Sequence, residues 1–154
     1  MCPATDVELA ATPDGRRIEV SRVVDTPVER AWEVLTDTER WPEWGPTVTD
    51  VRSDRRFVRT GTRGDVRVLG GPWIPFEVTA CEKYRWTWDV ADLPATGHRV
   101  EPEPYERSRV VFELPPLAAG YVPVCVRAIS NVERLVGGDR ATDDATDEAV
   151  DENS

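Results

Sequence analysis

The sequence predicts an α+β fold in which a curved antiparallel sheet wraps around one long C-terminal helix. Three observations predict it: a strand hairpin opens the chain, short strands separated by turn residues fill its middle, and a long helix with a broad apolar face closes it. The 154 residues suffice for one core. Such an arrangement can leave a space between sheet and helix, where a ligand would bind.

The first elements are a strand hairpin and a helix. Residues 7–9 and 18–24 alternate apolar and polar side chains as strands do, and the Pro-Asp-Gly of residues 13–15 is typical of a turn. Thr26 is predicted to cap the following helix, with Glu29 completing a capping box. Apolar residues then recur at the spacing of one buried helical face.

An aromatic corner follows this helix, which is expected to end near Asp37. Residues 38–41 can begin a second, short helical turn, and the prolines and glycine of residues 41–46 stop it. Trp41 and Trp44 are expected to anchor this short helix against the sheet, because an aromatic side chain buries a large area. The alternative is that they close one end of a pocket or form a partner surface.

The middle of the chain predicts a meander of antiparallel strands. The expected strands are residues 48–53, 57–60, 65–69, 76–81, 85–90, 98–101 and 108–114. Turn-forming segments at residues 61–64, 70–72 and 93–97 separate several of them. The glycines of these turns lack the pattern of a phosphate-binding loop.

The last element is a long helix after the proline pair at 115–116, and the glycine pair at 137–138 is expected to end it. The sequence therefore predicts a single domain over residues 1–138. Seven of the last 16 residues are acidic and one is basic, so residues 139–154 are expected to form an acidic disordered tail.

Composition excludes several classes of protein. A formal net charge of −10 argues against a nucleic-acid partner held by phosphate contacts. No apolar run approaches the ~20 residues that cross a bilayer, and no secretion signal is recognisable, which predicts a cytoplasmic protein. Three separated cysteines and one histidine predict no disulfide framework, metal site or cofactor. The oligomeric state stays open.

The order of elements resembles the SRPBCC superfamily, which joins START lipid-transfer domains, birch-pollen-allergen proteins and polyketide cyclase/dehydrase-like proteins. The resemblance covers residues 16–136 and rests on the strand at 18–24, the DTPVERAWEVLTD segment at 25–37, the WPEW at 41–44 and the last helix. It implies a helix-grip fold and the binding of lipids, steroids, hormones or polyketide intermediates. The superfamily shares no catalytic motif, so no catalytic residue follows from it.

Three further segments, residues 85–90, 95–101 and 117–125, are similar to superfamily members from halophilic archaea. The composition agrees, since the chain is acidic and Lys83 is its only lysine among 19 bases. In concentrated salt the repulsion within a negatively charged protein is screened. We therefore expect a halophilic protein whose stability rises in molar salt.

Period-two alternation places Trp86 and Trp88 on one sheet face, with His98 and Val100 on a neighbouring strand. If this face is concave, it lines the pocket. The candidate ligand-binding residues are Phe76, Trp86, Trp88, His98, Val100, Phe112, Tyr121 and Cys125. The alternative is a packed core built from the same residues.

These residues predict a protein that binds a small hydrophobic molecule, lipid-like or polyketide-like, between the sheet and the last helix. One alternative is a cyclase or dehydratase in which His98 moves a proton, because its ordinary pKa lies near neutral pH. Another is a protein-interaction module that uses the outer sheet face or the tail. The sequence alone does not choose between them.

Overall fold

The computed structural model describes the backbone of residues 5–151 and the side chains of residues 5–138. Its one sheet is antiparallel throughout, with the strand order β1-β2-β8-β7-β6-β5-β4-β3. The strands are β1 (Asp6–Thr12), β2 (Gly15–Val24), β3 (Val48–Ser53), β4 (Arg63–Val68), β5 (Trp73–Glu82), β6 (Arg85–Val90), β7 (Leu93–Glu103) and β8 (Arg107–Leu114). The predicted α+β fold is confirmed.

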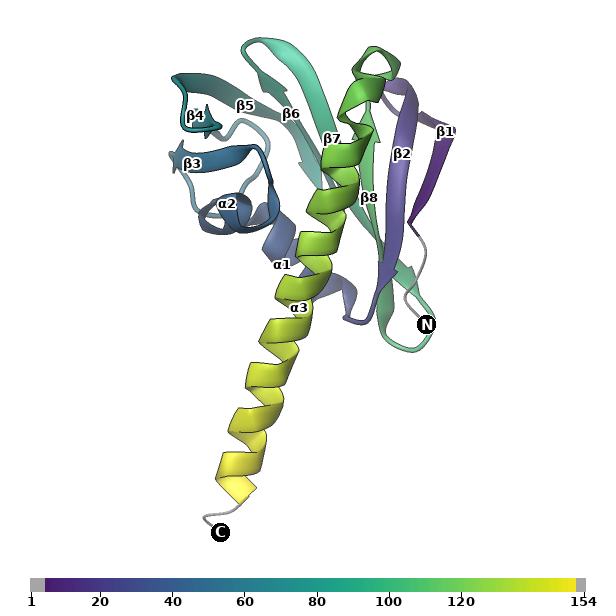
Figure 1. The fold of residues 1–154 in the computed structure, drawn as a ribbon, viewed down its shortest axis with the longest axis vertical. Helices are drawn as coiled ribbons and strands as arrows, with labels where there is room; N and C mark the ends of the chain where they lie inside the picture. Colours follow the sequence, from purple (N-terminus) through teal and green to yellow (C-terminus); the bar gives the residue numbers. More distant parts are fainter. Residues whose placement is uncertain (1–4, 152–154) are drawn as a thin grey trace.

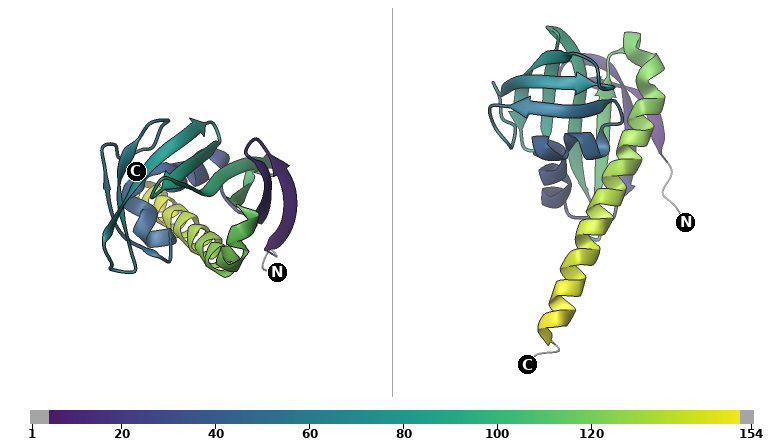
Figure 2. Two further views of the ribbon diagram at one scale, coloured as in Figure 1. Left: turned by 90° about the horizontal axis from the view of Figure 1, so that it is seen from above. Right: turned by 60° about the vertical axis from the view of Figure 1, so that its left-hand side comes forward.

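Helices fill the concave side of this sheet. They are α1 (Val28–Thr36), the 3-10 turn η1 (Thr38–Arg40), α2 (Trp41–Trp44), the 3-10 turn η2 (Pro116–Tyr121) and α3 (Val122–Asp151). The sheet curls around α3, and α1 and α2 lie beside α3 below the β3–β4 hairpin (Figures 1 and 2). Cys125, Ala128, Ile129, Val132 and Val136 bury the inner face of α3 against the core. This is the helix-grip arrangement.

The predicted capping box at Thr26 is wrong. Helix α1 begins one residue later, with Pro27 at the N-cap and no side-chain cap. Glu29 is therefore the second helical residue and not the third, which is the position from which a capping-box side chain bonds back to the N-cap. Thr26 is buried instead, its N–H donates to the carbonyl of Val24 and its carbonyl accepts from the hydroxyl of Ser108.

Two strand predictions are also wrong. Residues 57–60 form one isolated bridge, Asp37 with Phe57, and the Val58 N–H donates to the Thr36 carbonyl at the end of α1. The segment contacts Cys81 of β5 through side-chain hydrogen bonds and not through a strand ladder. Residues 93–97, expected to be a turn, belong to β7. The turn is shorter, consisting of Ala91 and Asp92, which both adopt the positive φ values of a two-residue hairpin.

Helix α3 continues to Asp151, so the predicted stop at the glycine pair 137–138 is wrong. Neither glycine adopts the positive φ of a helix-ending residue. The prediction of an acidic disordered tail concerns residues 139–154, which lie outside the residues whose side chains are described. Within the described residues, no helix is long and apolar enough to span a membrane.

Candidate ligand cavity

Two adjoining cavities lie on the concave side of the sheet, the inner one against α3 and the outer one against η2. The inner cavity has a volume of about 60 Å³ and the outer cavity about 250 Å³. They share the wall residues Thr47, Val48, Trp88, Thr96 and Tyr121. None of the described residues that line either cavity is charged. The walls therefore suit an apolar molecule with few polar groups.

The register of three neighbouring strands builds the wall of the inner cavity. Trp86 on β6 pairs with His98 on β7, which pairs in turn with Phe112 on β8. The Trp86 and His98 rings stack with centroids 3.9 Å apart, and the Phe112 ring meets His98 edge-on at 5.1 Å. Cross-strand partners on one face approach closely, so this row of rings follows directly from the strand pairing.

The aromatic corner supplies the opposite wall. The indole N–H of Trp41 donates to the carbonyl of Leu35 at 3.0 Å, and that of Trp44 donates to Val34 at 3.2 Å. These bonds fix α2 on the last turn of α1. The Trp41 ring stacks on Trp86 with centroids 5.2 Å apart, and both tryptophans line the inner cavity. Trp41 and Trp44 thus anchor the short helix and also close the pocket.

A short chain of polar groups crosses the shared wall. The indole N–H of Trp88 donates to Thr96 Oγ1 at 3.1 Å, and Thr96 Oγ1 lies 3.0 Å from His98 Nε2. Either of these two atoms can donate, depending on the tautomer of the neutral imidazole. The other ring nitrogen, Nδ1, has no hydrogen-bond partner among the described residues.

Burial keeps the imidazole neutral. His98 is 2% exposed, and burial lowers its pKa from 6.5 to about 3, with a smaller contribution from the positive charge of Arg85. Burial also raises the pKa of the Cys125 thiol to about 12, so the thiolate nucleophile is absent at neutral pH. These side chains are suited to hydrogen bonding and apolar contact rather than to proton transfer.

A second polar contact spans the same wall. The hydroxyls of Thr47, before β3, and Tyr121, at the end of η2, lie 2.6 Å apart. Tyr121 is 38% exposed, and burial of part of its ring raises the pKa of its phenol. Because both residues line both cavities, this pair stands between the inner and the outer space.

The structure brings most of the predicted site residues together. Those that line the inner cavity are Trp86, Trp88, His98, Phe112, Tyr121 and Cys125. Phe76 and Val100 are buried in the core and line neither cavity, and Phe76 packs against Trp41 and Trp88. Their assignment to ligand binding stays a prediction.

Sequence reasoning missed Thr47 and Thr96 as wall residues. Thr96 was expected in a turn, and only the strand assignment places its hydroxyl beside His98. Thr47 follows the aromatic corner, where no pattern in the sequence signals a contact with Tyr121, 74 residues away. The tryptophans of the corner were detectable, since the spacing of Trp41 and Trp44 puts both on one side of a helical turn.

The curved sheet, the gripped helix, the apolar cavities on the concave side and the family match define the class: a helix-grip protein of the SRPBCC type. The chain belongs to the family described as polyketide cyclase / dehydrase and lipid transport, whose profile matches residues 15–135. No curated protein matches the chain.

Solved structures share the fold at low sequence identity. CalU16 from Micromonospora echinospora, in its solution structure, has a TM-score of 0.61 at 21% identity, covering 89% of this chain and 76% of that one. NE0264 from Nitrosomonas europaea has a TM-score of 0.59 at 18% identity, covering 81% and 96%. Ms6760 from Mycobacterium smegmatis has a TM-score of 0.59 at 16% identity, covering 87% and 99%. At these identities the likeness concerns the fold alone.

Proposed function

We propose that this protein binds a small, mostly apolar molecule, lipid-like or polyketide-like, in the space between the sheet and α3. The observation that carries the proposal is the pair of adjoining, uncharged cavities of about 60 and 250 Å³. Both cavities open to the surface and are lined mainly by apolar side chains, so an apolar molecule can enter them. The family to which the chain belongs supports the same class of ligand.

Apolar burial supplies the affinity in this proposal. A ligand that loses about 300 Å² of apolar surface gains about 7 kcal/mol at roughly 25 cal/mol per Å², before the costs of association and ordering. Polar groups then orient the ligand. The hydroxyls of Thr47, Thr96 and Tyr121 lie on the wall that both cavities share, so one ligand hydroxyl or carbonyl bonds there while its hydrocarbon fills the outer cavity.

A cyclase or dehydratase that uses His98 is the second candidate. Its support is the contact of His98 Nε2 with the Thr96 hydroxyl at 3.0 Å, a hydrogen-bonding group within reach of the imidazole. The low pKa of His98, about 3, opposes it, because an efficient general acid or base has a pKa near the working pH. Binding without proton transfer is therefore the better-supported function.

Filling the outer cavity tests the binding proposal. Ala118 lines this cavity, whereas the neighbouring Ala119 is exposed. We expect Ala118→Trp to weaken the uptake of an apolar fluorescent dye by about tenfold or more, which corresponds to about 1.4 kcal/mol. Ala119→Trp adds the same side chain outside the cavity and serves as the matched control.

Dye titration and native mass spectrometry with decanol and 2-decanone provide the two readouts. Uptake by the wild type and by Ala119→Trp, with loss in Ala118→Trp at an unchanged melting temperature, supports the proposal. Equal uptake by both variants, or no uptake by the folded wild type of dye, alcohol or ketone, contradicts it.

A further inference from the structure

Three exposed leucines lie next to residues that line the outer cavity. Leu69, Leu93 and Leu117 have exposed fractions of 74%, 69% and 104%, and they come from three separate places in the chain: the turn after β4, the first residue of β7, and η2. Each is the direct neighbour in sequence of a residue that lines the outer cavity. These neighbours are Val68, Pro94 and Ala118. We call the three leucines the leucine rim.

The backbone holds the rim in place although its side chains pack on little. Leu69 and Gly70 both have positive φ, 52° and 70°, in a tight turn closed by the bond from the Gly71 N–H to the Val68 carbonyl at 2.9 Å. Asparagine or glycine adopts this conformation more readily than leucine. Stability therefore gives no reason for an exposed leucine at this position, and a strained, exposed residue points to a function.

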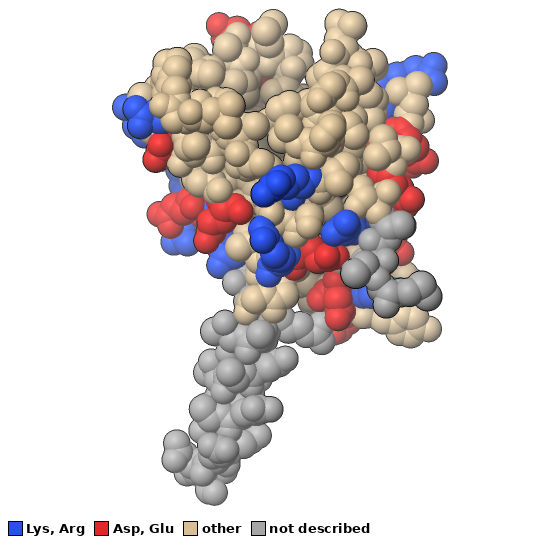
Figure 3. Space-filling model, in the orientation of Figure 1, with Lys and Arg blue, Asp and Glu red and all other residues tan. Residues whose placement is uncertain are grey.

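The rim lies in a part of the surface that is depleted of charge. Residues with charged side chains make up 31% of the chain, yet segments 69–73, 91–96 and 115–126 together contain one, Asp92. Figure 3 shows the charged side chains of this face gathered on its lower half and flanks, with a nearly uncharged upper half. An uncharged surface with protruding apolar side chains marks an interaction site.

We propose that the leucine rim docks on a lipid surface, with its side chains in the boundary between headgroups and acyl chains. Three leucines on separate elements would each need a pocket of its own in a rigid protein partner, whereas the acyl layer of a bilayer accommodates each leucine without one. The outer cavity opens between them, so an apolar ligand can pass between bilayer and cavity without crossing water. This last step rests on the proposed ligand binding.

The net charge of the protein predicts which lipids it prefers. With a formal charge of −10, the chain is repelled by anionic lipids, and Arg67, whose guanidinium donates to the Gly71 carbonyl in the turn of Leu69, offsets this only in part. We therefore expect binding to vesicles of neutral phosphatidylcholine, and weaker binding as phosphatidylserine is added. The weakening of binding by phosphatidylserine should become smaller at higher salt, because salt screens the repulsion.

Flotation with phosphatidylcholine vesicles at about 0.15 M KCl tests the rim. The variant Leu69→Ser/Leu93→Ser/Leu117→Ser should lower the vesicle partition coefficient by about tenfold or more. The control is Val7→Ser/Leu9→Ser, which removes apolar side chains that are 51% and 52% exposed on the edge strand β1, outside the mouth. All five side chains are exposed, so both variants are expected to fold.

Dye uptake without vesicles separates this inference from the proposed function. A rim variant that takes up dye like the wild type but no longer floats supports the inference. Flotation that is unchanged by the rim substitutions, or lost equally in the control, overturns it. If the wild type does not float and instead self-associates through the rim, the leucines form an interface between two copies of the chain, and the inference is overturned. A wild type that floats through the rim yet takes up no apolar dye contradicts the proposed function instead.

Discussion

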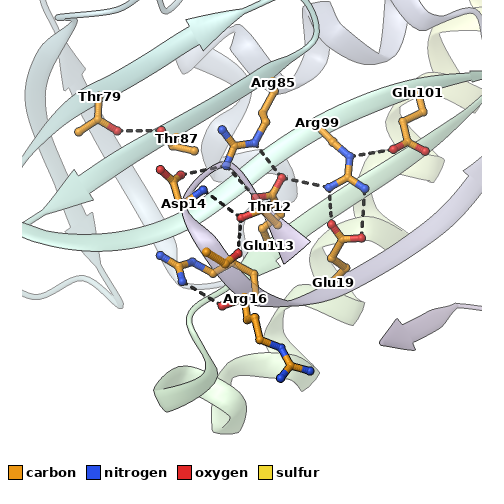
Figure 4. A network of polar contacts seen from close by, with 12 residues as sticks. Thr12, Asp14, Arg16, Glu19, Thr79, Arg85, Thr87, Arg99, Glu101 and Glu113 are labelled. Atoms are coloured by element: carbon orange, nitrogen blue, oxygen red, sulfur yellow. Dashed lines mark hydrogen bonds and ion pairs between the residues drawn. The ribbon is translucent and has the colours of Figure 1, made fainter. Parts of the chain in front are cut away.

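The two faces of the sheet differ in how completely their polar groups are paired. Strands β6, β7 and β8 carry the row Trp86, His98 and Phe112 on the concave face. The adjacent residues on the convex face are Arg85, Arg99 and Glu113. The convex row joins Glu19 of β2 in a network of ion pairs (Figure 4).

On the convex face every buried charge has a partner. Glu113 is 2% exposed and accepts hydrogen bonds from Arg85 at 2.8 and 3.0 Å and from Arg99 at 3.1 Å. Glycine at position 97 makes this possible, because a Cβ there would lie 3.1 Å from Glu113 Oε1. On the concave face, His98 Nδ1 and the Trp86 indole N–H have no partners among the described residues. The convex face also has a hollow, of about 270 Å³, but its lining includes Asp14, Arg17 and Glu113, so the uncharged concave face is the one suited to an apolar ligand.

The largest expected effect comes from the concave face. Trp86→Ala removes a ring that is fully buried between Trp41 and His98. We expect the free energy of unfolding to fall by about 3–5 kcal/mol, since large-to-small core substitutions lose transfer free energy and leave a cavity. Urea unfolding measures it, and a loss below about 1 kcal/mol would show that the aromatic row is not part of the stable core.

A smaller loss is expected on the convex face. Glu113→Gln leaves the guanidinium groups of Arg85 and Arg99 without their shared carboxylate. We expect a loss of about 2 kcal/mol, at the low end for a broken buried pair, because the two arginine side chains are 20% and 22% exposed and can be hydrated. Glu77→Gln breaks the exposed pair with Arg63 and should cost less than about 0.5 kcal/mol. Equal losses in the two variants would contradict a distinct role for the buried network.

Lowering the pH should reduce the stability of the fold through His98, which lies on the concave face. The pKa of His98 in the folded chain, about 3, lies below its value of 6.5 in the unfolded chain. Between these values the unfolded chain binds a proton that the folded chain does not, so lowering the pH favours unfolding. We expect this residue to remove up to about 1.4 kcal/mol of stability per pH unit between about pH 6 and 4.

The comparison with His98→Gln isolates this contribution, because glutamine can still accept the Thr96 hydroxyl but does not titrate. Urea midpoints across the pH range should fall more steeply for the wild type than for the variant. Parallel slopes would show that the imidazole also binds a proton in the folded protein. The cavity wall at His98 would then be accessible to water.

The convex and concave rows were predictable to different degrees. Alternation along residues 85–90 and 98–101 predicted that Trp86 and His98 point inward, and the structure places both on the cavity wall. Alternation also implies that Arg85 and Arg99 point outward. Their partner Glu113 was not predictable, because the bond from Arg85 reaches across β7 and depends on the missing Cβ of Gly97.

The parts of the site that sequence reasoning missed come from turns. Ala91 and Asp92 form a two-residue turn without a glycine, so the strand start at Leu93 was placed too late and Thr96 was lost from the wall. The turn at residues 70–72 was predicted from its glycines, but Leu69 was assigned to the strand before it, and nothing local indicated that this turn lies beside the cavity. Long-range contacts that place turns around a mouth are set by the curvature of the whole sheet.

Salt should have the smallest effect on stability, and it should act differently on the protein's net charge and on the buried network of the convex face. Screening in molar KCl relieves the self-repulsion of a chain with a net charge of −10, so the melting temperature should rise. The corresponding gain in the free energy of unfolding is on the order of 1 kcal/mol or less. The buried Glu113 network is shielded from salt, so the stability difference between wild type and Glu113→Gln should stay nearly constant. A midpoint that does not rise between low and molar KCl would contradict the expected salt adaptation. A Glu113→Gln difference that shrinks strongly in salt would show instead that the convex network is open to solvent.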